Sequence, residues 1–229
     1  MIAIMGAMPE EIAPLLERMD HYEEVVYAKN RYYLASYEGK SLVIAYSKIG
    51  KVFAALTAAT MIEKFGATRL LFSGVAGAIN PDLKIGDLIV ATKLCQHDLD
   101  ITAFGHPYGY VPEGSVYVES DSSLRAIAQS VASQKGINLR EGIIATGDQF
   151  VADLQRKTWI AKEFGADALE MEGGSVAVVC ESLGVPFFIL RAISDAADMD
   201  AGFNFDKFLE SSAKGSADFI LSMLKMMDA

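Results

Sequence analysis

Three carboxylates stand where apolar segments of the sequence end, a placement suited to acid–base chemistry. Glu11 follows the apolar run 2–5, Glu172 lies in the sequence ALEMEGG, and Asp195 follows the mostly apolar run PFFILRAIS. A carboxylate in apolar surroundings is either a structural ion with a partner or a tuned functional group. Such a set could divide general-base, ribose-binding and general-acid work among its members. For any one acid taken alone, a helix cap or an ion pair with Arg191 is an equally good interpretation.

Glycines and small residues accompany these acids at the segment ends. They occur in the sequences Gly6-Ala7-Met8, Ser73-Gly74-Val75-Ala76-Gly77 and Glu170-Met171-Glu172-Gly173. Glycine lets the backbone approach a ligand closely, and ligands gather at the carboxyl ends of strands in α/β sheets. For SGVAG, a tight turn between a strand and a loop is the alternative interpretation. The run lacks the G-x-G-x-x-G pattern, so it gives only weak support to dinucleotide binding.

Other reactive side chains give weaker signals. His97-Asp98-x-Asp100 has the residue types of a metal site, but no further histidine stands at ligand spacing, which favours a loop network. Cys95 and Cys180 stand beside apolar residues and are expected to be packing thiols. Two cysteines alone make neither a disulfide framework nor a zinc site. We therefore expect no metal.

An α/β framework is needed to position these residues. Apolar runs predict strands at 2–5, 23–28, 31–37, 41–46, 69–74, 87–92, 140–147 and 185–195. Periodicity and capping signals predict helices at 9–19, 50–66, 122–135 and 206–227, and a further helix at the end of 168–184. Strands that alternate with helices indicate an α/β sandwich, and the adjoining strands at 23–46 favour a mixed sheet. No linker divides the chain, so we predict one domain over 1–229.

Composition excludes several classes of protein. Of 229 residues, 52% are hydrophobic and 22% charged, which is too apolar for a disordered chain. The net charge of −10 and the absence of a basic patch argue against nucleic-acid binding. No stretch of about 18 apolar residues predicts a membrane span, and the first residues lack a positive signal-peptide region. We expect a cytoplasmic protein that binds neither nucleic acid nor membrane.

Together the motifs resemble one family. The runs GAMPEEIAPLL, YSKIGKVFAA, FSGVAGAINPDLKIGDLIVAT, HDLDITAFGHPYGYVP, IATGDQFV, ALEMEGGSVAVVC and VPFFILRAISDAAD follow the family's order over essentially the whole chain. The sequence resembles 5′-methylthioadenosine/S-adenosylhomocysteine nucleosidase. The resemblance implies a nucleoside-phosphorylase-like three-layer α/β sandwich, with a central mixed β-sheet flanked by helices. It also implies a homodimer that hydrolyses the N-glycosidic bond of 5′-substituted adenosines without a metal or other cofactor.

The resemblance implies a role for each matching residue. Glu11 would orient and deprotonate the attacking water, Glu172 would bind the ribose hydroxyls, and Asp195 would protonate adenine N7 with help from Ser194. Phe150 would stack on adenine and the Val151 backbone would read its Watson–Crick edge. The ribose and 5′-substituent would contact Met8, Ile49, Met171 and Phe205, and Val75, Gly77 and Arg191 would complete the substrate-binding set. From the partner subunit, Ile101, Phe104 and Pro112 would reach into the site.

Two residues depart from the family's pattern. Pro9 stands where many relatives have another acid, and a proline is tolerated at a helix start. Val75 stands where other members carry serine, which removes a hydroxyl near the ligand. Val75, together with SKIGKV and QHDLDITAFGHPYGYVPE, resembles the branch that also cleaves 6-amino-6-deoxyfutalosine in menaquinone synthesis.

Two other functions remain as alternatives. A purine nucleoside phosphorylase of the same fold would use phosphate in place of water and would need cationic or hydroxyl ligands for it. The segment ends offer mainly Arg191, and Glu11 would repel phosphate. A non-catalytic nucleoside sensor would keep the pocket but would not need all three acids. Adenine release measured with and without phosphate separates these alternatives.

Overall fold

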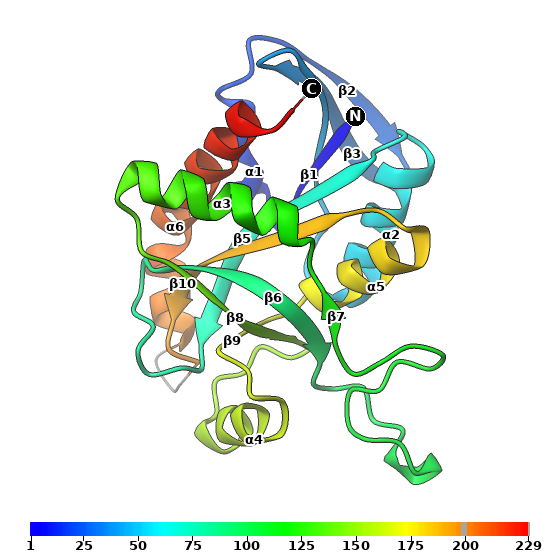
Figure 1. The fold of residues 1–229 in the computed structure, drawn as a ribbon, viewed down its shortest axis with the longest axis vertical. Helices are drawn as coiled ribbons and strands as arrows, with labels where there is room; N and C mark the ends of the chain where they lie inside the picture. Colours follow the sequence, from blue (N-terminus) through cyan, green and yellow to red (C-terminus); the bar gives the residue numbers. More distant parts are fainter. Residues whose placement is uncertain (198–200, 229) are drawn as a thin grey trace.

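The computed structural model describes residues 1–197 and 201–228, and it has a mixed β-sheet with helices on both faces (Figure 1). The strands are β1 (Ile2–Gly6), β2 (Tyr22–Tyr27), β3 (Asn30–Tyr37), β4 (Lys40–Tyr46), β5 (Arg69–Ala78), β6 (Leu88–Gln96), β7 (Val118–Glu119), β8 (Leu139–Thr146), β9 (Ala168–Glu170) and β10 (Phe187–Asp195). The helices are α1 (Pro9–Leu16), α2 (Lys51–Glu63), α3 (Ser122–Lys135), α4 (Leu154–Phe164), α5 (Gly173–Leu183) and α6 (Ala201–Met226), with a 3₁₀ turn η1 (Thr102–Phe104). Asp198, the last residue of VPFFILRAISDAAD, lies outside the described residues.

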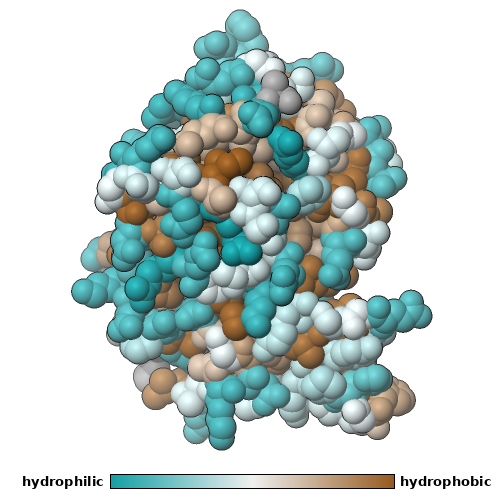
Figure 2. Space-filling view, viewed as in Figure 1, coloured by the Kyte–Doolittle hydropathy of each residue, from teal (hydrophilic) through white to brown (hydrophobic). Residues whose placement is uncertain are grey.

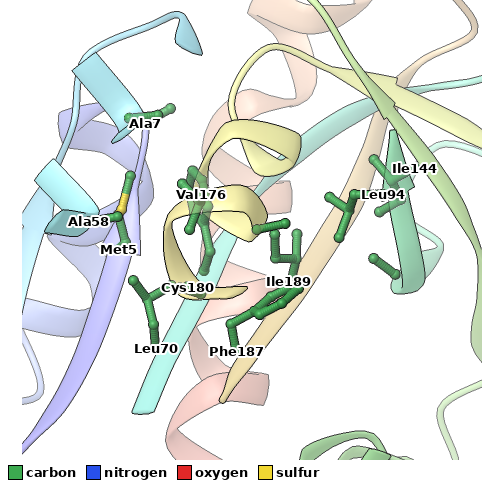
Figure 3. Packing of buried hydrophobic residues seen from close by; sticks show 14 of the residues in the cluster. Met5, Ala7, Ala58, Leu70, Leu94, Ile144, Val176, Cys180, Phe187 and Ile189 are labelled. Atoms are coloured by element: carbon green, nitrogen blue, oxygen red, sulfur yellow. The ribbon is translucent and has the colours of Figure 1, made fainter. Parts of the chain in front are cut away.

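Helices cover both faces of the sheet because successive strand side chains point to opposite sides. On one face, α2 and α5 pack on the strands, and Figure 3 shows Val176 and Cys180 of α5 between Met5 of β1 and Ile189 of β10. On the other face, α1, α3 and α6 pack on alternate residues of the same strands, such as Ile4 of β1. The predicted three-layer sandwich around a mixed sheet is therefore confirmed.

The sheet folds back on itself beside these layers. Strands β4, β1, β5 and β10 pair in parallel in that order, and β2 and β3 extend the β4 edge in antiparallel pairs. Strand β10 also pairs with β6, from which β8 and β9 lead back to β5. The ends of strands that are distant in sequence consequently meet around one hollow.

Two local features differ from the sequence predictions. The run SGVAG is not a turn, because β5 continues to Ala78 and Val75 pairs with Ala192 of β10. Helix α4 was not predicted, although its sequence carries the usual signals. Asp153 caps its start by accepting the Arg156 amide at 2.9 Å, and Gly165 ends it with φ 59°.

Hydrophilic residues cover much of the surface seen in Figure 2, with apolar residues scattered between them. Within residues 1–197 and 201–228, every helix is too short or too polar to span a bilayer.

Candidate active site

A cavity opens where β1, β5, β8, β9 and β10 end. It is lined by Ala7, Met8, Glu11, Ile49, Val75, Ala76, Gly77, Gln149, Phe150, Val151, Leu169, Glu170, Met171, Glu172, Ser194, Asp195 and Phe205. The structure thus brings the three predicted acids and nearly all of the predicted substrate-binding residues to one cavity. Ala7, Ala76 and Glu170 were named only as members of the segment ends, without a role, and Gln149 and Leu169 were not predicted, although each adjoins a predicted residue.

Glu11 is held by backbone amides from two elements. Its Oε2 accepts the amides of Ala7 at 2.5 Å and Met8 at 3.1 Å, and its Oε1 accepts the amide of Val75 at 3.0 Å. The Met8 bond ties the side chain to the start of α1, where an acid is favoured. Burial raises the pKa of Glu11, against the opposing effects of Arg191 and the three amides. Glu11 is therefore fixed in direction and poised to hold a proton more tightly than a free glutamate.

Glu172 also lines the cavity, immediately before α5. Its Oε1 accepts the backbone amide of Gly50 at 2.9 Å, which joins it to the loop between β4 and α2. Burial and the negative charge of Glu170 raise the pKa of Glu172 to about 8, while the Gly50 amide and Arg191 lower it. Burial first, and the repulsion between the two carboxylates second, make the ionised form of Glu172 the costly one.

Asp195 and Ser194 end β10 at the cavity. The Ser194 hydroxyl donates to Asp195 Oδ2 at 2.9 Å, and the Ala197 amide donates to Oδ1 at 2.8 Å. Gly77 faces this carboxyl so closely that a Cβ at that position would lie 2.7 Å from Oδ1. Gly77 of SGVAG is therefore explained by the close approach of the Asp195 carboxyl and not by a turn.

Arg191 departs from the prediction that it binds substrate. It is absent from the cavity lining, and its Nη2 lies 2.7 Å from Glu170 Oε2, with both side chains almost fully buried. Glu170 Oε2 also accepts the amides of Glu172 and Gly173, and its Oε1 accepts the Thr146 hydroxyl. The ion pair with Arg191, which the sequence offered as the alternative role for an acid in apolar surroundings, is formed by Glu170. Arg191 balances a carboxylate that holds the Glu170–Gly173 turn in place.

The rest of the wall is apolar and aromatic. Phe150 and Phe205 meet edge to face, with ring centroids 5.8 Å apart and an interplanar angle of 85°. Met8, Ile49 and Met171 line the same space. Aromatic faces and thioethers suit a flat, apolar ligand group, while the acids suit its polar edge.

Ile101, Phe104 and Pro112 do not line the cavity of their own chain. They lie in the segment between β6 and β7, which extends away from the body of the molecule around η1 (Figure 1). The side chain of Phe104 is 82% exposed. Their role in a partner's cavity stays a prediction.

The remaining candidates have structural partners. His97 is buried beside Arg156, whose Nη2 lies 3.1 Å from Nδ1, and burial and this charge lower the pKa of His97 to about 4. Burial raises the pKa of Cys95 and Cys180 to about 12, as befits packing thiols. In the part of the chain that the structure describes, no three His, Cys, Asp or Glu side chains are grouped to hold a metal.

Comparison with known proteins agrees with this geometry. Residues 1–225 match the family model described as the phosphorylase superfamily. The chain is 57% identical over 226 residues to aminodeoxyfutalosine nucleosidase of Campylobacter jejuni, covering 99% of both chains. It is 39% identical over 229 residues to 5′-methylthioadenosine/S-adenosylhomocysteine nucleosidase of Geobacillus thermodenitrificans, covering 99% of this chain and 97% of that one.

A solved structure supports the same grouping. A variant of the Helicobacter pylori 5′-methylthioadenosine nucleosidase with 5′-methylthioadenosine in the active site matches with a TM-score of 0.97 and 50% identity, covering 99% of this chain and 98% of that one. Both the sequence relatives and this structure match over nearly the whole described fold. The chain belongs to the phosphorylase superfamily and, within it, to the nucleosidases that these relatives represent.

Proposed function

We propose that this protein hydrolyses the N-glycosidic bond of 5′-substituted adenosines and releases adenine. The observation that carries the proposal is the convergence of Glu11, Glu172 and Asp195 on one cavity whose other walls are apolar and aromatic. Glycoside hydrolysis needs an acid for the leaving group, a base for water and a negative environment for an oxocarbenium-like transition state. The three acids can supply these functions without a metal.

In the proposed reaction, Asp195 donates a proton to adenine N7 as the bond from C1′ to N9 breaks. Adenine then leaves as a neutral base and the electron pair of the bond goes with it. Ser194 orients the Asp195 carboxyl through its hydroxyl, 2.9 Å away. The wall of Phe150 and Val151 holds the base while it leaves.

The sugar is the other half of the reaction. Glu172 binds the ribose hydroxyls, and its charge stabilises the positive charge that develops at C1′. Glu11 accepts a proton from the attacking water, whose oxygen bonds to C1′. The amides of Ala7, Met8 and Val75 fix the direction of the Glu11 carboxylate.

Water rather than phosphate is the proposed acceptor of the ribosyl group. Among the described lining residues of the cavity there is no lysine or arginine to bind a dianion, and the nearby Arg191 is paired with Glu170. The test is adenine release from 5′-methylthioadenosine in buffer with and without inorganic phosphate. Release that requires phosphate would make the protein a phosphorylase, and tight nucleoside binding without release would make it a sensor.

We expect broad tolerance at the 5′ end of the substrate. Met8, Ile49, Met171 and Phe205 give that end an apolar wall, which would bind a methylthio group by burial at roughly 25 cal/mol per Å². Differences between substrate groups bound in an apolar pocket are worth about 1–3 kcal/mol. The values of kcat/KM for 5′-methylthioadenosine, S-adenosylhomocysteine and 6-amino-6-deoxyfutalosine should therefore agree within about two orders of magnitude. Side-by-side measurement of the three constants checks this. No detectable cleavage of aminodeoxyfutalosine would restrict the enzyme to thionucleosides.

We also propose a homodimer in which each subunit completes its partner's cavity. Val52 and Leu56 expose apolar side chains on α2 just after Ile49 of the cavity wall, and Phe104 exposes its ring on the projecting segment. Contiguous exposed apolar patches mark interaction sites, and these side chains could contribute to one. A two-fold dimer would place Ile101, Phe104 and Pro112 of one subunit at the site of the other.

Mixing two inactive variants tests the shared site. Phe104→Ala should lose activity by leaving the partner's cavity open, and Asp195→Asn should lose it by removing the acid. In a dimer that exchanges subunits, the mixture should regain about a quarter of wild-type activity, because each hybrid holds one intact site. Activity of Phe104→Ala equal to the wild type, or no recovery on mixing despite subunit exchange, would contradict the arrangement.

The cytoplasmic location and the single domain over 1–229 stay predictions. Cell fractionation tests the location, and limited proteolysis tests the domain organisation.

A further inference from the structure

The motif His97-Asp98-x-Asp100 has no part in the reaction described above, yet Asp98 sits in an unusual position. Its carboxylate does not line the cavity, but it joins two segments that do. Asp98 Oδ1 lies 2.6 Å from Lys51 Nζ, and Oδ2 accepts the backbone amide of Asp148 at 2.8 Å. The side chains of Lys51 and Asp98 are only 18% and 16% exposed, so this ion pair is shielded from water.

The contacts close a triangle around the start of α2. Lys51 is the first residue of α2, and its backbone amide donates to Asp148 Oδ1 at 2.8 Å. Gly50, with φ 103°, precedes it and donates its amide to Glu172 Oε1 at 2.9 Å. The direction of the Gly50 amide therefore depends on how the start of α2 is held. Through Lys51, Asp98 and Asp148 fix the hydrogen bond that orients the ribose-binding acid.

The same triangle fixes the wall for the base. Asp148 leads directly into Gln149, Phe150 and Val151, which line the cavity. The other side of the triangle is anchored to the sheet, because the His97 amide donates to the Thr146 carbonyl at 2.8 Å. Arg156 also donates to the His97 carbonyl at 3.1 Å. Asp98 thus links two parts of the cavity lining. Through Asp148 it holds the segment Gln149–Val151, and through Lys51 it holds Gly50, which binds Glu172.

We propose that Asp98 is a positioning residue that sets the distance between the adenine wall at Phe150–Val151 and the ribose-binding carboxylate of Glu172. This inference rests on the proposed function and deepens it. Burial opposes ionisation of Asp98, but the Lys51 ammonium and the Asp148 amide outweigh it and hold the pKa of Asp98 below its usual range. The Asp98 carboxylate therefore stays ionised to a lower pH than an ordinary aspartate, and it keeps both of its contacts there.

The test is Asp98→Asn, assayed for adenine release and for inhibition by free adenine. Asparagine keeps the shape of aspartate, but its NH₂ group must face either the Lys51 ammonium or the Asp148 amide. Both of these groups are donors, so one of the two contacts is lost. KM should rise at least about tenfold and kcat should fall less than about threefold, because the displaced contacts to the base and the ribose hydroxyls hold substrate and transition state alike. The inhibition constant for adenine should rise by a similar factor. A merely structural role would lower the melting temperature but leave both constants unchanged at temperatures where the variant is folded.

Further variants separate the outcomes. Glu141→Gln removes one partner of the Arg125–Glu141 pair, 3.5 Å long and remote from the cavity lining, and should leave KM unchanged. Asp98→Glu should recover part of the affinity, and Lys51→Met tests the same bond if Asp98→Asn does not fold. In the double variant, the rise in KM should be smaller than the product of the two separate rises, because both substitutions remove the same contact between Lys51 and Asp98.

Three results decide the matter. A wild-type protein that releases no adenine overturns the proposed function and this inference together. Wild-type activity with KM and adenine inhibition unchanged in both Asp98→Asn and Lys51→Met overturns the inference alone. Raised KM with weaker adenine inhibition, and no change in Glu141→Gln, supports it.

Discussion

Asp195→Asn is expected to lower kcat for adenine release by roughly 10²–10⁴-fold, the usual contribution of a general acid. Asparagine has the shape of aspartate but no proton to deliver to N7. Its carbonyl can still accept the Ala197 amide, and its amide can donate to Ser194, whose hydroxyl can then turn to the Ala76 carbonyl, 3.4 Å away. The fold and the affinity for the substrate should therefore survive. The measurements are single-turnover adenine release, thermal melting and calorimetric binding of 5′-methylthioadenosine.

Two variants frame this result. Ser194→Ala removes the hydroxyl that orients the acid but leaves the carboxyl, so it should lose less activity than Asp195→Asn. Asp82→Asn changes a carboxylate whose side chain is 79% exposed, and it should have no effect. If Asp195→Asn retains a tenth or more of wild-type turnover, Asp195 is not the general acid.

The sequence was most informative about the layers of the fold. Apolar strands such as 187–195 are buried on both faces and therefore show as continuous runs, and capping residues such as Asp121 and Gly136 mark where α3 starts and ends. Helix α4 was overlooked because its apolar residues are few. Only Ile160 and Phe164 of that helix are fully buried among the described residues, so its periodicity is weak.

The sequence predicted those cavity residues whose immediate neighbours in the chain already set them apart. Glu11, Glu172 and Asp195 stand out because charged groups rarely follow apolar runs without a reason. For Arg191 the sequence left substrate binding and an ion pair open, because it does not show which of several neighbouring acids an arginine will pair with. Glu170 and Glu172 are two residues apart, and only the turn before α5 decides that the first faces Arg191 and the second faces the cavity.

Hydrogen bonds between residues far apart in the chain could not be predicted from the sequence for a similar reason. The Gly50 amide reaches Glu172 across 122 positions, and Lys51 reaches Asp98 across 47. No spacing rule connects such pairs, because the closing of the sheet through β10 and β6 brings them together. The SGVAG run shows the same limit, since its glycine serves a carboxyl on another strand.

Glu11→Gln is expected to lower kcat/KM by roughly 10²–10⁴-fold, because the amide cannot accept a proton from the attacking water. The glutamine carbonyl can still accept the Ala7 and Met8 amides, but its NH₂ then faces the Val75 amide. That mismatch costs about 1–3 kcal/mol of stability, so folding must be checked by thermal melting. Glu10→Gln is the matched control, since Glu10 is an exposed acid in the same first turn of α1.

The pH profile separates a catalytic base from an acid that merely caps α1. The base must be ionised, and burial raises its pKa, so wild-type kcat/KM should rise with pH as the interacting pair Glu11 and Glu172 loses protons. Glu11 contributes to the raised pKa of Glu172, so replacing it with a neutral residue should lower that pKa. The weak residual activity should then rise at a lower pH than in the wild type, in assays from about pH 5 to about pH 9. Near-normal activity with an unaltered profile would leave Glu11 as a helix-start acid and would require another group to activate the water.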